Sequence, residues 1–342
     1  MAESEFTVRA TQPSDAGALN DLYRRLTGIE RTVAQWQWEW IDVPGGPAPS
    51  WVIVERASDR VVGHHGVVPV PLVHGARRLN AARTENTMID PDARRRIVYP
   101  PIEARLLTEL LQRFDLIFTT SGKGAHGLVR KRLGYRSAGQ WRTFTIAMTP
   151  SYIAQRLAGA ALGRLLSPLG AAIHRGKAGW TIDETADAAQ IAGHCARWNA
   201  DCIGPDRTTA HLRWRLNDHP YHRFRLGLLR RNGEPAAFLA WRDADGPNGT
   251  REVQIEDLCA AGNDGATIDA AFDALAALYC TKPARITLRT LDNGRPLARM
   301  ATTRAARYRR AEPSDSAELL VRSDQHLDAL PWDATMLLAE GI

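Results

Sequence analysis

Three consecutive arginines, Arg94, Arg95 and Arg96, are the residues whose type and spacing point most directly to chemistry. A guanidinium group holds several N–H donors in a fixed fork, and this geometry suits the oxygens of a phosphate. Pro100 and Pro101 follow, and they suit a helix start, where the first N–H groups have no partner within the helix. The stretch is therefore either a site for a phosphate-bearing ligand or a solvated basic loop.

Aromatic and acidic residues form two further candidate groups. Trp36, Trp38 and Trp40 alternate, so on an extended strand they would share one face, as an aromatic shelf for a substrate or as part of the core. Glu256 and Asp257 are neighbours on a predicted strand. Successive residues of a strand face opposite sides of its sheet, so only one of the two carboxylates can reach a cleft.

No metal site is predicted. The four cysteines form no C-x-x-C pair and fit no familiar zinc spacing, so we expect buried free thiols. His64 and His65 are neighbours on a predicted strand, so at most one of them faces a site. The first residues, MAESEF, are acidic and polar, unlike a secretory signal, and we expect a cytoplasmic location.

The composition is that of a globular protein, with 44% hydrophobic and 24% charged residues in 342. The net charge is +6, but only four of the 44 basic residues are lysine, a bias that indicates a GC-rich genome more than a nucleic-acid surface. The apolar stretch 157–173 is shorter than the ~20 residues of a membrane span and contains Arg164. We expect a packed connector there and no membrane association.

An internal repeat organises the chain. Trp38, Asp42 and Pro44 recur as Trp214, Asp218 and Pro220, always at an offset of 176 residues. Each copy precedes a predicted hairpin, then strand, helix, strand, helix and strand, and mixed elements in this order predict an α/β sheet with helices on its faces. The paired elements are hairpins at 51–72 and 224–241, strands at 82–89 and 252–260, helices at 101–114 and 267–280, and strands at 115–120 and 285–291.

These residues resemble the GNAT superfamily of N-acyltransferases. The resemblance covers about residues 6–145, while the second half matches by repeat and element order alone. It predicts two GNAT-like mixed-sheet domains in tandem: an N-terminal domain at 1–146, a helical linker with the start of the second half at 147–205, and a degenerate C-terminal domain at 206–342. The resembling segments are Phe6–Thr11 with Asp15, Val62-Gly63, Met88–Arg94 and Arg132–Tyr135.

The resemblance implies where a donor would bind. In the family the sheet opens after the fourth strand, pantetheine pairs with strand backbone, and pyrophosphate rests on N–H groups of a loop with small residues at the next helix. Arg94 matches the first position of that loop, but Ile97 and Tyr99 stand where small residues belong. The implied donor site comprises Ile89, Arg94, Arg95, Arg96, Ile97 and Val98.

The resemblance also implies catalytic roles. A family tyrosine protonates the leaving thiolate, and Arg130 occupies its position here, so Tyr99 or Tyr135 would have to substitute. Glu85 is the candidate carboxylate that takes the amine proton. Trp38, Trp40, Trp214, Glu256 and Asp257 are the candidates for an acceptor pocket.

Three functions remain open from the sequence. The first is an N-acyltransferase that moves an acyl group from acyl-CoA, or from the phosphopantetheine of an acyl carrier protein, to a small-molecule amine. The second is an aminoacyl-tRNA-dependent transferase, because tandem GNAT-like halves resemble peptidoglycan-bridge ligases and the chain is basic. The third is a non-catalytic GNAT-like scaffold that binds a metabolite or partner.

Overall fold

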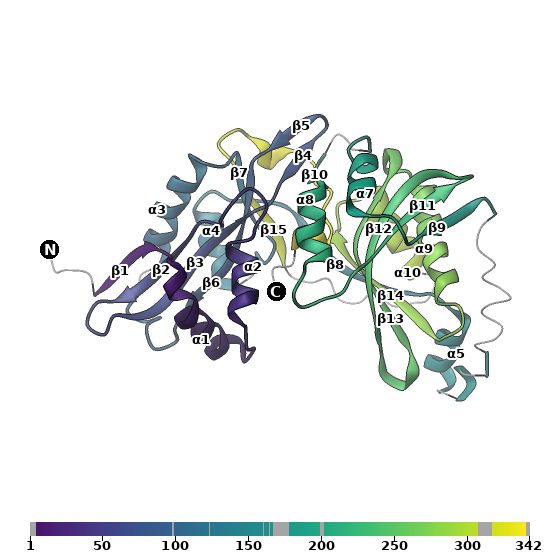
Figure 1. The fold of residues 1–342 in the computed structure, drawn as a ribbon, viewed down its shortest axis with the longest axis horizontal. Helices are drawn as coiled ribbons and strands as arrows, with labels where there is room; N and C mark the ends of the chain where they lie inside the picture. The colour runs from purple at the N-terminus through teal and green to yellow at the C-terminus, as the bar shows by residue number, and fades with distance from the viewer. Residues whose placement is uncertain are drawn as a thin grey trace.

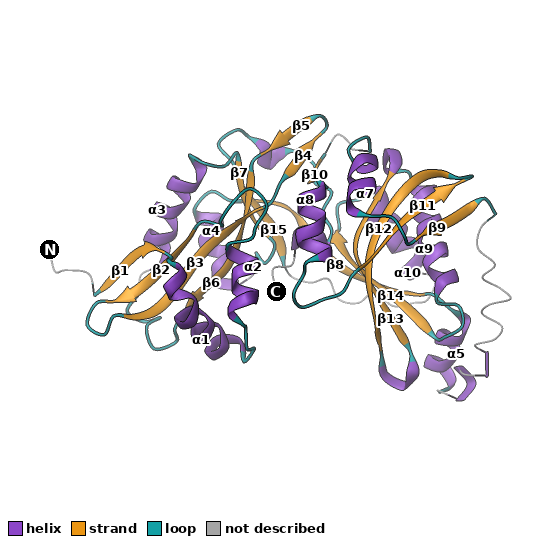
Figure 2. Cartoon of the chain, in the orientation of Figure 1, coloured by secondary structure: helices purple, strands orange, loops and turns teal. Residues whose placement is uncertain are grey.

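A computed structural model describes residues 5–97, 99–122, 124–159, 161–163, 165–166, 178–198, 202–306 and 317–339 (Figure 1). These residues form a mixed α/β structure whose helices lie on the faces of a twelve-stranded sheet (Figure 2). The predicted α/β class and mixed sheet are confirmed. The sheet order is β1-β2-β3-β6-β7-β15-β8-β14-β13-β12-β11-β9, and β10, β4 and β5 form a separate small sheet.

The elements have the following bounds. The strands are β1 Phe6–Ala10, β2 Ser50–Glu55, β3 Arg60–Pro69, β4 Leu72–His74, β5 Arg77–Leu79, β6 Ala81–Ile89, β7 Leu116–Thr119, β8 Arg136–Ala147, β9 Trp180–Asp183, β10 Ile203–Pro205, β11 Arg225–Arg231, β12 Glu234–Asp245, β13 Arg251–Ala260, β14 Ala284–Leu291 and β15 Glu318–Arg322. The helices are α1 Ala16–Thr27, α2 Val33–Trp40, α3 Tyr99–Leu111, α4 Gly124–Arg132, α5 Pro150–Ala158, α7 Ala188–Cys195, α8 Thr209–Leu212, α9 Gly265–Leu278, α10 Pro296–Ala306 and α11 Met336–Ala339.

The two halves of the chain exchange their last strands. From one edge, the large sheet contains β1, β2, β3, β6 and β7 of the N-terminal half, followed by β15. From the other edge, it contains β9, β11, β12, β13 and β14 of the second half, followed by β8. Thus β15, yellow in Figure 1, pairs with β7 in the N-terminal half, and β8 pairs with β14 in the second half. The exchanged strands also pair with each other, so one sheet runs without a break across both halves.

Local turn chemistry sets the predicted hairpins. Asp59 between β2 and β3 has φ 53°, and Asn232 and Gly233 between β11 and β12 have φ 52° and 90°. Aspartate, asparagine and glycine tolerate this left-handed region better than other residues, so the chain reverses there. The strands on both sides lie within a few residues of the predicted ranges.

Alternating residues of β3 divide the core of the N-terminal half between two faces. Val61 packs with α1 and the tryptophans of α2, whereas Val62 packs with Ile97 and Tyr99 at the start of α3. This alternation follows from the two-residue period of a strand. It places α1 and α2 on one face of the sheet and α3 on the other.

The tryptophan segment is a helix and not a strand. Thr32 and Gln35 form a capping box, in which each side chain accepts from the other residue's backbone N–H, and α2 begins at Val33. Residues two apart on a helix point in different directions, so Trp38 does not share the face of Trp36 and Trp40, which lie one turn apart. All three are buried in the core, so of the two alternatives the core placement is confirmed and the substrate shelf is excluded.

The segment between the halves contains strands as well as helices. Within 147–205 the structure describes α5, α7, β9 and β10, while much of the apolar stretch at 157–173 lies outside the described residues. No helix among the described residues has the length and apolar character to cross a membrane. The proposed domain boundaries stay a prediction.

Candidate functional site

The sheet of the N-terminal half opens between β6 and β7. Their parallel pairing covers only Ala81 to Arg83 on β6, opposite Leu116 to Phe118 on β7. Beyond Arg83, β6 continues to Ile89 and remains paired with β3 on its other side. Near Asn86, which has φ 45°, β6 contains one extra residue relative to β3. The bulge and the short register leave one edge of β6 open.

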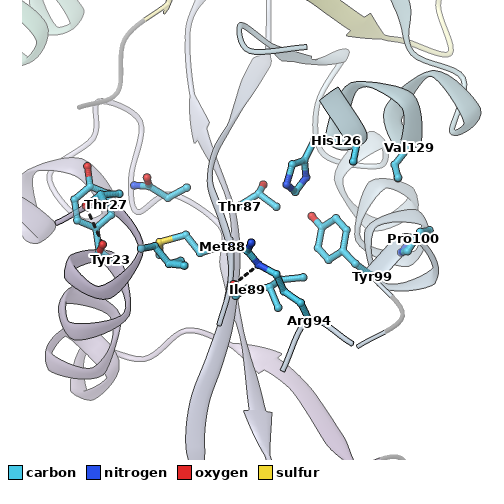
Figure 3. A pocket seen from close by; sticks show the side chains of 13 residues that line it. Tyr23, Thr27, Thr87, Met88, Ile89, Arg94, Tyr99, Pro100, His126 and Val129 are labelled. Carbon is cyan, nitrogen blue, oxygen red and sulfur yellow. Dashed lines mark hydrogen bonds between the residues drawn. The ribbon is translucent and has the colours of Figure 1, made fainter. Parts of the chain in front are cut away.

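A pocket of about 590 Å³ lies along this open edge. Figure 3 shows Tyr23 and Thr27 of α1 on one side of β6, and Tyr99 and His126 on the other. Its size is typical of small-molecule sites, and its wall is largely apolar. The lining residues are Tyr23, Leu26, Thr27, Asn86, Thr87, Met88, Ile89, Arg94, Tyr99, Pro100, Ala125, His126 and Val129.

The three arginines take different directions. Arg94 lines the pocket, and its Nε donates to the carbonyl of Ile89 (3.1 Å; Figure 3). Arg95 is exposed. Arg96 turns to the outer edge of the sheet, where it pairs with Glu5 (2.9 Å) and Glu55 (2.7 Å). Of the predicted donor site, the pocket therefore includes Ile89 and Arg94 but not Arg96.

The bulky residues of the loop do not close the opening. Ile97 is buried beneath the turn, packed with Ile53 and Val62, and Tyr99 forms one wall of the pocket. Val98 lies outside the described residues.

Tyr99 joins a buried polar network. Its hydroxyl lies 2.6 Å from Nδ1 of His65, and burial lowers the pKa of His65 to about 3, so the ring is neutral and its tautomer decides which of the two groups donates. Burial also raises the pKa of Tyr99, which keeps its proton on the hydroxyl. Arg130 lies behind it and donates to Glu103 (2.9 Å), Thr119 (2.9 Å) and Thr87 (3.3 Å). Arg130, at the position where the resemblance predicts a tyrosine, is thus a buried cation held by polar neighbours.

His126 is a pocket residue that the sequence analysis missed. It lies on α4, and its ring stands edge-on to Tyr99 with centroids 6.2 Å apart. Partial burial, with the nearby Arg130 charge, lowers the pKa of His126, so the ring is neutral at pH 7 and can accept a proton. Its signal in the sequence was only its place early in the helix that follows β7.

Two predicted catalytic residues lie away from the pocket. Tyr135 is buried in the core with Leu107 and Ile117. Glu85 pairs with Arg83 (2.9 Å) and does not line the pocket. The structure therefore brings Tyr99, but neither Tyr135 nor Glu85, to the open edge of β6.

A second acidic residue lies next to the bulge. Glu39 of α2 is 1% exposed, pairs with Arg31 (2.7 Å) and accepts from the side chain of Asn86 (2.7 Å). Burial raises the pKa of Glu39. Because Asn86 lines the pocket, its hydrogen bond to Glu39 holds one of the pocket side chains in place.

The corresponding opening in the second half is filled. β13 and β14 pair only as far as Ile255 and Leu288. Beyond that point Thr335 bridges to Thr290 of β14 and donates to Asp257 of β13 (2.8 Å). The C-terminal segment, residues 332–339, therefore fills in the second half the space that corresponds to the open space beside β6 in the N-terminal half.

The predicted acceptor residues are packed inside the protein. Glu256 pairs with Arg215 (2.8 Å) and Asp257 with Arg207 (2.6 Å), and all four side chains are buried. The other members are equally enclosed: Trp38 and Trp214 stack on each other, and Trp40 packs on His64. None of the five predicted acceptor residues lines the 590 Å³ pocket.

No group of three or more histidines, cysteines or acidic residues in the described part of the chain could hold a metal ion. Cys195 and Cys202 are buried free thiols, and Cys259 and Cys280 are partly buried free thiols.

Solved structures share this fold, although no family model and no curated protein matches the sequence. A probable N-acyltransferase from Enterococcus faecalis V583 is 14% identical, with TM-score 0.61 over 93% of this chain and 72% of that one. A GCN5-related N-acetyltransferase from Anabaena variabilis is 13% identical, with TM-score 0.62 over the same shares. The chain thus has the fold of the GCN5-related N-acetyltransferases, as its motifs predicted.

A more distant structure carries a ligand. The N-myristoyltransferase of Saccharomyces cerevisiae with bound myristoyl-CoA is 10% identical, with TM-score 0.54 over 94% of this chain and 83% of that one. At 10–14% sequence identity, these similarities show the fold alone.

Proposed function

We propose that the protein is an N-acyltransferase that moves an acyl group from a phosphopantetheine thioester to an amine. The observation that carries this proposal is the open edge of β6 at Asn86–Ile89, which forms one wall of the 590 Å³ pocket. An unpaired strand edge offers N–H and C=O groups to which the amides of a pantetheine arm can pair, as an added strand would.

The polar residues of the pocket fit this reaction. The amine nitrogen attacks the thioester carbonyl, the C–N bond forms, the C–S bond breaks and the sulfur leaves as a thiolate. Neutral His126 accepts the amine proton, and the Tyr99 hydroxyl donates a hydrogen bond to the sulfur as its charge develops. In the tautomer that carries its proton on Nδ1, His65 donates to the Tyr99 oxygen and holds the hydroxyl in place, so the Tyr99 proton stays available for the sulfur.

The pocket has room for the acyl chain on an apolar wall. Leu26 and Met88 lie on the α1 side of β6, and Val129 lies on the α4 side. Burial of hydrocarbon against such side chains stabilises a bound acyl group at about 25 cal/mol per Å².

Amine-dependent release of free thiol from acyl donors tests the proposal. The wild-type protein is incubated with acyl-pantetheine and acyl-CoA thioesters and a panel of primary amines, and amide products are identified by mass spectrometry. Tyr99→Phe and His126→Gln should each lower kcat by about 10²-fold, the lower range for positioned acid–base groups. Absence of amide product with every donor and amine would favour the non-catalytic scaffold.

A further inference from the structure

The turn between β6 and α3 uses its own backbone N–H groups. Five of the six N–H groups of residues 92–97 donate to oxygens within the turn, at distances between 2.9 and 3.1 Å. Asp92 donates to Oδ1 of Asp90, Ala93 and Arg94 to the Asp90 carbonyl, and Arg96 and Ile97 to the Ala93 carbonyl.

The first turn of α3 offers little more to an anion. A helix N-terminus binds phosphate through its free N–H groups. Pro100 and Pro101 stand at the second and third positions of α3 and have no N–H. The exposed side chain of Asp92 adds a carboxylate to the same turn. The described part of this turn therefore does not fit a pyrophosphate.

Two arginine side chains of this turn remain for a phosphate. Arg94 lines it and Arg95 is exposed, and among the described residues neither pairs with a carboxylate. Guanidinium groups bind a single phosphate through their N–H forks without help from the backbone. A phosphate bound by Arg94 would lie next to the pocket that would hold the pantetheine arm.

Building on the proposed acyl transfer, we propose that the donor site recognises the phosphopantetheine arm and one phosphate, and not the nucleotide part of CoA. This arm is common to acyl-CoA and to an acylated carrier protein. The site would contact the same atoms of both donors, from the thioester to the first phosphate. The remainder of CoA would lie outside the site.

Calorimetric titration of the whole chain with four ligands tests the inference. CoA and 4′-phosphopantetheine should bind with Kd values within about threefold, and pantetheine about fivefold more weakly, as expected for one exposed ionic contact. Adenosine 3′,5′-bisphosphate should not bind. CoA binding more than tenfold tighter than 4′-phosphopantetheine, competition by the bisphosphate, or no binding of 4′-phosphopantetheine would overturn the inference.

Arginine variants assign the phosphate contact. The double variant Arg94→Ala/Arg95→Ala should bind 4′-phosphopantetheine and pantetheine equally, whereas Arg132→Ala, an exposed arginine of α4, should keep the fivefold difference. An unchanged difference in the double variant would overturn the assignment.

Turnover separates this inference from the proposed function. Acyl-CoA more than tenfold better than acyl-phosphopantetheine would overturn the inference and leave acyl transfer intact. Similar turnover of the two, or preference for an acyl carrier protein, would support the inference. The expected binding pattern without transfer from any donor would support the arm site and overturn the transferase.

Discussion

Trp38 and Trp214 lie face to face, and each indole N–H donates to the main-chain carbonyl of the other residue, at 3.1 and 3.0 Å. Their ring centroids are 4.9 Å apart and their planes differ by 19°. They are also the two equivalent positions of the sequence repeat, 176 residues apart. The contact therefore joins the halves at the centre of their internal symmetry.

This pair should contribute measurably to stability. Trp38→Phe and Trp214→Phe each remove one N–H and leave a buried carbonyl without its donor, so each should lower the free energy of unfolding by about 1–3 kcal/mol. The double variant should lose about 1 kcal/mol less than the sum, because the residues are in contact. Urea denaturation measures all three, with Trp180→Phe at a partly exposed strand as the control. Strict additivity would mean that the two residues act independently.

The C-terminal segment should contribute to stability as part of the hydrophobic core of the second half. Leu337 is 1% exposed and packs with Leu212 and Phe238. Leu337→Ala should lower the free energy of unfolding by about 2–5 kcal/mol, the usual range for a buried leucine. Leu157→Ala, at a residue 82% exposed, should change it by less than about 0.5 kcal/mol. Equal effects of the two substitutions would show that the segment does not fill the opening beside β13.

Acid should destabilise the protein through its buried histidines. Burial lowers the pKa of His64 to about 4 and that of His65 and His211 to about 3, from an ordinary 6.5. The unfolded chain takes up protons as pH falls below 6.5 while the folded chain does not, so stability present above pH 6.5 is lost toward pH 4. At pH 5 each histidine should account for about 2 kcal/mol.

Urea midpoints at pH 7 and pH 5 measure this loss. His211→Gln should be less sensitive to acid than the wild type by about 2 kcal/mol at pH 5. If the urea concentration at the midpoint is no lower at pH 5 than at pH 7, the buried histidines are not neutral in the folded protein.

Local signals in the sequence identified most of the strands. Asn232-Gly233 and Asp59 reverse the chain where hairpins were predicted. Local sequence signals do not predict which strands pair with β8 and β15. Each exchanged strand meets an equivalent edge in the other half, so the residue pattern is the same with or without the exchange.

The repeat contained more information than three matched residues. Arg31-Thr32 recurs as Arg207-Thr208 at the same offset, and Thr32 and Thr208 cap α2 and α8 through the N–H groups of Gln35 and His211. These caps identify a helix where the tryptophans suggested a strand.

The candidate site depended on contacts that no local pattern reveals. The resemblance implies an acceptor pocket that contains Glu256 and Asp257. Their partners, Arg215 and Arg207, come from a segment more than 40 residues earlier. In contrast, the open edge of β6 followed from the resemblance, and Arg94 and Tyr99 both lie at the pocket beside it.

Blocking the pocket beside β6 tests the central claim most directly. Ala125 lines the pocket from α4, whereas Ala189 is an exposed residue of α7 in the second half. Binding of 4′-phosphopantetheine is measured by calorimetry for Ala125→Trp, Ala189→Trp and the wild type. A pantetheine site along Asn86–Ile89 predicts at least a tenfold weaker Kd for Ala125→Trp and an unchanged Kd for Ala189→Trp. An unchanged Kd for Ala125→Trp would contradict the account.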